Sequence, residues 1–232
     1  MELPKKKVKA SRKSPKNMII YGAPKIGKTT ILSELDDCLI LDLEEGADMV
    51  DALKIKVTSL KELAEIGKEI IKQDRPYKYI AIDTISKLEE WCEEDAKKLY
   101  MTTPMGKNFE TKNPGMSVLS LPNGGGYLYL RIAYKKWIDR LNKLADHIIL
   151  VGHLKDKMLE KKGKEVAVKD LDLTGKIKQI TCANADAVGY IYREDDKTMV
   201  SFNSLEDVTA GSRCNHLRGQ TMPFEWSKIF ID

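Results

Sequence analysis

The sequence predicts an α/β fold, an open and mostly parallel twisted sheet with helices on both faces. Short apolar runs of four to six residues alternate along the chain with longer segments whose apolar residues recur at helical spacing. The runs contain few polar residues, as expected for strands buried between two layers of helices. Ligands of such sheets bind beyond the carboxyl ends of the strands, so residues at these ends are the first candidates for a site.

The expected strands and helices alternate from residue 17 onward. The apolar runs that predict buried strands are Asn17–Tyr21, Cys38–Leu43, Tyr79–Ile82 and Ile148–Val151. The helical segments run from the turn after the first strand to about Leu35, and then over Leu60–Gln73, Ile85–Leu99 and Tyr127–Ala145. A later pair of strands, Ala187–Arg193 and Thr198–Phe202, flanks a polar turn. Because helices separate the first four strands, we expect the sheet to be mainly parallel.

Two stretches break this alternation and are expected to be irregular inserts in a single domain over residues 17–232. Residues 101–126 contain three prolines and five glycines, and residues 154–178 contain eight lysines and five acidic residues. Loops of this length in a compact domain are usually functional or mobile.

Residues 1–16 are expected to form a basic, flexible N-terminal arm. Residues 1–17 carry seven basic residues and one acidic residue, whereas the net charge of the whole chain is +4, so the remainder sums to −2. The arm could bind nucleic-acid phosphates by counterion release or simply keep the chain soluble, and both interpretations stay open.

Composition argues against membrane and secretory classes. No apolar run approaches the roughly 18 residues of a membrane span, and no apolar segment follows the N-terminal charges as in a secretory signal. The four cysteines are scattered without a C-x-x-C pair, which is typical of a reduced compartment without a structural zinc site. We therefore expect a cytoplasmic protein that makes no contact with a membrane.

The strongest motif is GAPKIGKT, residues 22–29, which fits G-x-x-x-x-G-K-[ST] between an expected strand and an expected helix. Backbone N–H groups of such a turn surround phosphate oxygens. Lys28 is expected to reach the β- and γ-phosphates, and the Thr29 hydroxyl to bind Mg²⁺. The predicted nucleotide-binding residues are Gly22, Ala23, Pro24, Lys25, Ile26, Gly27, Lys28, Thr29 and Thr30.

Acidic residues follow two of the expected strands. Asp83 ends the third strand and is expected to hold Mg²⁺ from a strand next to the phosphate-binding turn, although aspartate also commonly ends strands. The next residue is Thr84, so a carboxylate that activates water must come from elsewhere. The second strand ends in a cluster of Asp42, Glu44 and Glu45, of which we favour Glu44; an acidic helix cap is the alternative. The stretch NKLAD at residues 142–146 has one residue too many for the Asn-Lys-x-Asp guanine reader of GTPases, which favours ATP.

In this order, the segments GAPKIGKT, DLEEGAD, YIAID and IILVGH resemble the RecA-like P-loop ATPases over residues 17–202. Closest in size and layout are the compact phage RecA-like proteins that act in single-strand annealing and recombination. The resemblance implies that Glu44 is the catalytic glutamate, that Asp48 lies near the adenine, and that Asp83 is the Walker B aspartate. It also implies that His153, which stands where RecA carries a glutamine, senses the γ-phosphate. The two inserts take the places of the two DNA-binding loops.

The resemblance further implies a homo-oligomer, a ring or filament with ATP at the subunit interface, in which a neighbouring subunit contributes a basic residue. Arg213 and Arg218 are the candidates, and we favour Arg213. The implied activity is a Mg²⁺-dependent, DNA-stimulated ATPase that binds single-stranded DNA, in the cytoplasm of a bacterial host if a phage encodes it. Residues 131–143 carry five basic residues and one acidic residue, which a DNA groove and a solvated helix face explain equally well.

Two other functions stay open. The first is a nucleotide-binding assembly or regulatory ATPase, such as a helicase loader, without DNA stimulation. The second is a P-loop phosphotransferase, in which residues 154–178 would form a basic lid over the donor phosphates.

Overall fold

The computed structural model of the chain describes residues 3, 5–161, 164–205 and 208–231. Within these residues, ten strands form one mixed sheet in the order β10-β8-β7-β1-β5-β4-β2-β3, with β6 paired to β5 and β9 paired to β7. The strands are β1 Asn17–Gly22, β2 Cys38–Asp42, β3 Leu53–Lys56, β4 Tyr79–Asp83, β5 His147–Lys161, β6 Lys164–Leu171, β7 Ala187–Glu194, β8 Lys197–Ser201, β9 Gly211–Ser212 and β10 Thr221–Pro223. The pairs from β3 through to β7 are parallel, which confirms the predicted fold class.

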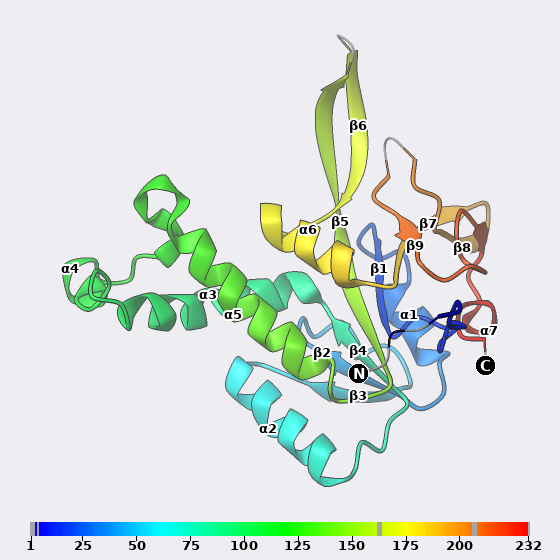
Figure 1. The fold of residues 1–232 in the computed structure, drawn as a ribbon, viewed down its shortest axis with the longest axis horizontal. Helices are drawn as coiled ribbons and strands as arrows, with labels where there is room; N and C mark the ends of the chain where they lie inside the picture. The colour runs from blue at the N-terminus through cyan, green and yellow to red at the C-terminus, as the bar shows by residue number, and fades with distance from the viewer. Residues whose placement is uncertain (1–2, 4, 162–163, 206–207, 232) are drawn as a thin grey trace.

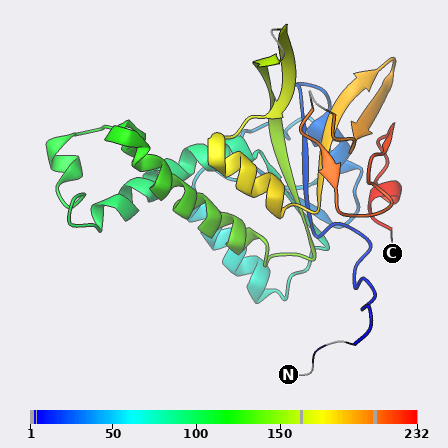
Figure 2. The same ribbon diagram turned by 45° about the horizontal axis from the view of Figure 1, so that its top comes forward.

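Helices cover both faces of the sheet (Figures 1 and 2), with α2, α3, α5 and α6 on one face and α1 and α7 on the other. The helices are α1 Lys28–Ser33, α2 Leu60–Lys72, α3 Ile85–Met101, α4 Phe109–Lys112, α5 Gly126–Leu141, α6 Gly175–Asn184 and α7 Trp226–Ile229, with 3₁₀ turns η1 Val118–Ser120 and η2 Pro122–Gly124. Alternate residues of each central strand enter the two cores: Ile19 and Tyr21 pack in the first layer, Met18 and Ile20 in the second. None of the helices in the described part of the chain is long and apolar enough to cross a membrane.

The strand that ends in Asp83 is not the neighbour of the phosphate-loop strand, so this part of the prediction is wrong. β5 lies between β1 and β4, and its register places His153 beside Gly22 and Val151 beside Asp83. The chain leaves β4 through α3, returns through α5 and enters the sheet between β4 and β1. His153 therefore lies at the end of the core part of β5. This strand separates the predicted phosphate site, which follows β1, from the predicted metal ligand Asp83 at the end of β4.

Residues 154–178 are not an irregular insert, and this prediction is also wrong. β5 continues without a break to Lys161, pairs antiparallel with β6, and the chain then enters α6 at Gly175. The β5–β6 hairpin projects beyond the sheet in Figure 1. A hairpin that projects from the core needs no continuous apolar run on its strands. The composition of the segment therefore indicated an irregular loop.

Residues 101–126 are more ordered than the predicted loop. They hold α4, η1 and η2, which join α3 to α5 at the far end of a helical arm (Figure 1). Phe109 and Val118 are buried there, and the Tyr100 ring lies 5.3 Å from that of Phe109 and 5.2 Å from that of Tyr129. The turn-rich composition therefore encodes tight turns around a small aromatic core.

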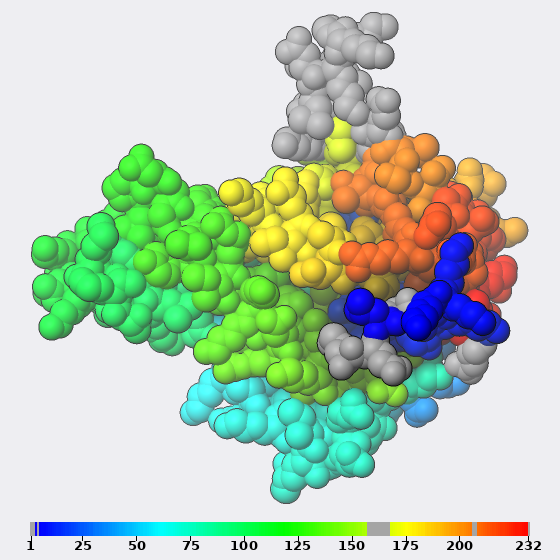
Figure 3. All heavy atoms as spheres, viewed as in Figure 1, coloured from blue at the N-terminus to red at the C-terminus, as the bar shows by residue number. Residues whose placement is uncertain are grey.

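The N-terminal segment lies against the C-terminal residues (Figure 3). The Ser14 hydroxyl donates to the Ile231 carbonyl at 2.6 Å, and the Lys16 backbone N–H donates to the Asp186 carboxylate at 2.8 Å. Residues 5–13 are exposed and contain neither helix nor strand. The end of the predicted arm is thus fixed to the domain.

Candidate nucleotide-binding site

The turn between β1 and α1 borders a cavity of about 380 Å³. Gly27 caps α1 with φ 98°, a conformation that favours glycine. Six of the predicted nucleotide-binding residues line this cavity: Pro24, Lys25, Gly27, Lys28, Thr29 and Thr30. The other three do not: Ile26 packs against the core below α1, and Gly22 and Ala23 contribute their carbonyl groups to Lys28.

Lys28 is buried and holds its ammonium group at the cavity. Its Nζ donates to the carbonyls of Gly22 at 3.1 Å and Ala23 at 2.9 Å. Burial lowers the pKa of Lys28, and the nearby carboxylates of Asp83 and Glu44 oppose this change. The two carbonyls and two carboxylates keep a cation at the position where the motif expects a phosphate contact.

Thr29 and Asp83 meet across the intervening strand. The Thr29 Oγ1 donates to Asp83 Oδ2 at 2.8 Å, and both residues line the cavity. Burial raises the pKa of Asp83, which the hydrogen bond from Thr29 opposes. A hydroxyl and a carboxylate side by side fit Mg²⁺, which prefers oxygen ligands and is usually shared with substrate phosphates. Among the described residues, no group of three or more His, Cys, Asp or Glu side chains could hold a metal ion.

The three acidic residues after β2 have separate roles in the structure. Asp42 accepts hydrogen bonds from the backbone N–H groups of Glu44, Gly46 and Ala47, and so shapes the loop. Glu45 points to Lys56 at 2.9 Å and does not line the cavity. Glu44 does line it and presents its carboxylate there. The geometry thus favours Glu44 over its neighbours as the group that can act on a water molecule.

Both carboxylate oxygens of Glu44 are engaged. The Thr84 Oγ1 donates to Oε1 at 2.6 Å, and the His153 Nε2 donates to Oε2 at 2.9 Å. The hydrogen bond from His153 is the main cause that lowers the pKa of Glu44, and the same bond raises the pKa of His153. The pair therefore favours an ionised carboxylate held in one orientation.

Thr84 was missed as a site residue. Its side chain is 2% exposed and lines the cavity, and its hydroxyl contacts Glu44 although 40 residues separate them. A hydroxyl directly after Asp83 was visible in the sequence, but only the folded chain brings it to the end of β2.

Two predicted residues lie outside the cavity. Asp48 is exposed beside it, and the following Met49 and Val50 contribute to its lining instead. Arg213 lies near the start of β7, where its backbone N–H donates to the Asp186 carbonyl at 2.7 Å and its guanidinium lies 3.8 Å from the Asp186 carboxylate. That is the opposite end of the strands from the phosphate loop, so Arg213 can reach a γ-phosphate only in a neighbouring subunit.

The parallel sheet, the phosphate loop on β1 and the acidic residues at the ends of β2 and β4 together define a RecA-like P-loop ATPase fold. Residues 14–214 match the family model AAA_24, described as an AAA domain. Since the match covers most of the chain, the protein belongs to this AAA-domain family.

Among solved structures, the chain is similar to one titled "Crystal structure of the RadB recombinase". The two are 13% identical, with a TM-score of 0.44, over 93% of this chain and 90% of the other. No curated protein matches the sequence.

Proposed function

We propose that the protein is a Mg²⁺-dependent ATPase that binds single-stranded DNA and acts in recombination or strand annealing. The observation that carries this proposal is the convergence, in one cavity, of Lys28, the Thr29–Asp83 pair and the Glu44–His153 pair. These are a phosphate cation, a metal-binding oxygen pair and an oriented carboxylate, the three parts that phosphoryl transfer to water requires.

Each group has a defined task. Lys28 binds the β- and γ-phosphate oxygens, and Glu44 orients the attacking water and accepts its proton. Thr29 and Asp83 would hold Mg²⁺, which when bound neutralises charge on the phosphates. His153, hydrogen-bonded to Glu44, reports whether the γ-phosphate is present.

The placement of the β5–β6 hairpin supports a link between the cavity and DNA. The hairpin begins directly after His153, and the Asp172 N–H at its end donates to the His153 carbonyl at 3.0 Å. The Ser86 hydroxyl at the start of α3 donates to the Asp172 carbonyl at 2.9 Å. Residues 154–171, which make up the hairpin, carry six lysines and four acidic residues, an excess of positive charge that suits a phosphate backbone. A strand of DNA on this hairpin would therefore bias the position of His153.

ATP turnover with and without oligo(dT), over a salt series, tests the proposal. We expect stimulation that falls as salt rises, because phosphate contacts release counterions. Glu44→Gln should bind nucleotide without turnover, and His153→Ala should bind ATP and turn it over without the response to DNA. If oligo(dT) neither stimulates ATP turnover nor retains the protein at low salt, the DNA-binding part of the proposal is wrong. The ATPase part would still stand.

A nucleotide-dependent assembly ATPase is the second candidate, because the helical arm exposes apolar side chains. Met105 is 88% exposed, and Met116 and Leu128 are about half exposed. Flexible methionines on a surface suit a protein partner better than phosphates. Met105→Ser with Met116→Ser should leave DNA stimulation unchanged under the first candidate. Under the second candidate, oligo(dT) stimulates neither wild type nor this variant, and the same changes instead weaken binding of the protein partner.

A further inference from the structure

A β-turn beside the nucleotide cavity presents an isolated methionine to solvent. Met49 is 95% exposed, between the exposed Asp48 and the nearby Asp51. The Val50 N–H donates to the Ala47 carbonyl at 3.2 Å, which closes the turn. Lys54 on β3 also fixes the turn, since its Nζ donates to the Ala47 carbonyl at 2.6 Å and to the Val50 carbonyl at 2.8 Å. The backbone of the turn is therefore pre-organised, so binding through Met49 loses little backbone entropy.

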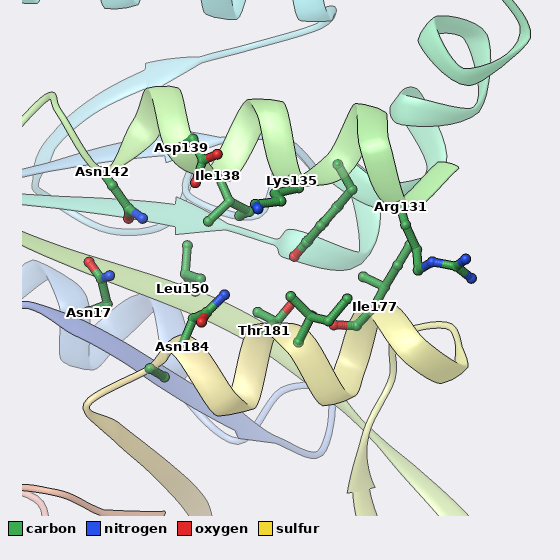
Figure 4. A pocket seen from close by; sticks show the side chains of 13 residues that line it. Asn17, Arg131, Lys135, Ile138, Asp139, Asn142, Leu150, Ile177, Thr181 and Asn184 are labelled. Atoms are coloured by element: carbon green, nitrogen blue, oxygen red, sulfur yellow. The ribbon is translucent and has the colours of Figure 1, made fainter. Parts of the chain in front are cut away.

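A groove between α5 and α6 has the complementary character (Figure 4). Its volume is about 400 Å³, within the range of roughly 300–1,000 Å³ typical of binding pockets. Its apolar lining includes Ile138, Leu150, Ile177 and Ile180, and Ile180 is 41% exposed. At one end lie the carboxamides of Asn17, Asn142 and Asn184, and Arg131 lies at the other (Figure 4).

The charges at the groove match those of the turn. Arg131 and Lys135 line the groove with one acidic residue, Asp139. Asn17 Oδ1 is buried in it and makes no hydrogen bond within the described part of the chain. The groove thus offers an apolar floor and an excess of positive charge.

We propose that the turn at Asp48–Asp51 of one copy of this chain docks into the α5–α6 groove of the next copy. Met49 enters between Ile138 and Ile180, and the two flanking aspartates face Arg131 and Lys135. An apolar anchor inside a pocket, surrounded by paired charges, is the usual composition of an interface hot spot.

This contact is head-to-tail. The turn follows β2 near the β3 edge of the sheet, whereas the groove lies over β1 and β5 between two helices. Because the turn and the groove lie on different parts of each copy, the same contact can repeat from copy to copy, which gives a ring or a filament. The inference rests on the proposed function and deepens it, by naming the surfaces that join the subunits. Met49 and Val50 also line the nucleotide cavity, so nucleotide and interface share one loop.

Sedimentation of two single variants and of their mixture tests the proposal. Met49→Gly removes the anchor, and Arg131→Glu sets an acid against Asp48 and Asp51. In the presence of Mg²⁺ and ATPγS, each variant alone should associate at least about tenfold more weakly than wild type. The mixture should form dimers that do not extend. The Arg131→Glu variant supplies an intact turn and the Met49→Gly variant an intact groove, so each pair can make only one such contact.

Met49→Leu and Arg131→Lys are the matched controls and should assemble as wild type does. The measurement requires neither turnover nor DNA, so a protein without ATPase activity or DNA binding could still pass it. Wild-type protein that stays monomeric with and without nucleotide overturns the proposal. So do variants that assemble normally, and so does a mixture that stays monomeric or extends beyond dimers.

Discussion

Replacing Thr84 with valine should slow ATP turnover without weakening nucleotide binding. Valine keeps the shape of a side chain that is 2% exposed but removes the hydroxyl that donates to Glu44 Oε1 at 2.6 Å. Nothing else holds that oxygen in the described part of the chain, whereas His153 holds the other. The carboxylate then rotates about its remaining hydrogen bond.

The size of the effect follows from the partners. A hydrogen bond to a charged group contributes about 1.5–3 kcal/mol. Glu44 is 33% exposed, so water replaces part of the loss and the lower value applies, about 1.5 kcal/mol. If that energy orients the carboxylate toward the attacking water, kcat falls about tenfold. The hydrogen bond from His153 still keeps the pKa of Glu44 below its ordinary value, so the group stays ionised near neutral pH.

Steady-state turnover and titration with a fluorescent nucleotide measure the two parts separately. We expect kcat to fall while KM and nucleotide affinity stay within about twofold, since Thr84 acts through Glu44. Thr84→Ser keeps the hydroxyl and should restore most of the rate. A wild-type rate in Thr84→Val, or an equal loss in Thr84→Ser, would refute the reasoning.

Three further changes test other parts of the molecule. Lys28→Ala should abolish measurable binding in the same nucleotide titration, and retained affinity would contradict the assigned phosphate contact. Trp226→Phe removes the indole N–H that donates to the buried Ile31 carbonyl at 2.6 Å. The free energy of unfolding, measured in urea, should fall by about 1–3 kcal/mol. An unchanged value would argue against that hydrogen bond. Because Glu44 raises the pKa of His153, that residue's contribution to stability is full below the ordinary histidine pKa of about 6.5 and is lost as pH rises through the raised value. The difference in unfolding free energy between wild type and His153→Ala should therefore become smaller from about pH 6 to about pH 9. The change should stay below about 1 kcal/mol, because Glu44 and His153 are both partly exposed. An equal difference at the two pH values would contradict this expectation.

The core strands could be predicted because burial on both faces leaves a continuous apolar run. β1, β2 and β4 begin at the predicted residue and end within one residue of the prediction. β3 was missed, because its four residues, LKIK, are exposed at the sheet edge and lack the continuous apolar run of the buried strands. β9 and β10 are two and three residues long, too short for any periodic signal.

α6 was missed for a different reason. Its ten residues bury only Ile177 and Thr181, so its sequence carries little helical periodicity. Its position depends instead on tertiary contacts, including the bond of Lys178 to the buried Asp170 on β6. The hairpin was likewise hidden, because lysines and acidic residues interrupt any apolar run on its two strands.

The candidate site likewise contains residues that a local motif predicts and residues that only the folded chain brings together. The phosphate loop is local in sequence, so its residues and their tasks follow from one motif. Glu44 could be ranked above Asp42 and Glu45 only by position, and the structure adds that those two have other partners. Thr84 required knowledge of the contact between two strand ends, which no local pattern contains.

The place of β5 between β1 and β4 explains why one histidine can contact both the cavity and the hairpin. β5 is a single strand from His147 to Lys161, so its backbone passes from the core into the hairpin through His153 without an intervening loop. Gly152 precedes it, and a Cβ there would lie 2.2 Å from Leu171 Cδ1 on β6, so the Leu171 side chain would have to shift to make room. The base of the hairpin is thus packed directly against the residue that precedes His153. We therefore expect a shift of the hairpin either to move the His153 ring relative to Glu44 or to break this packing.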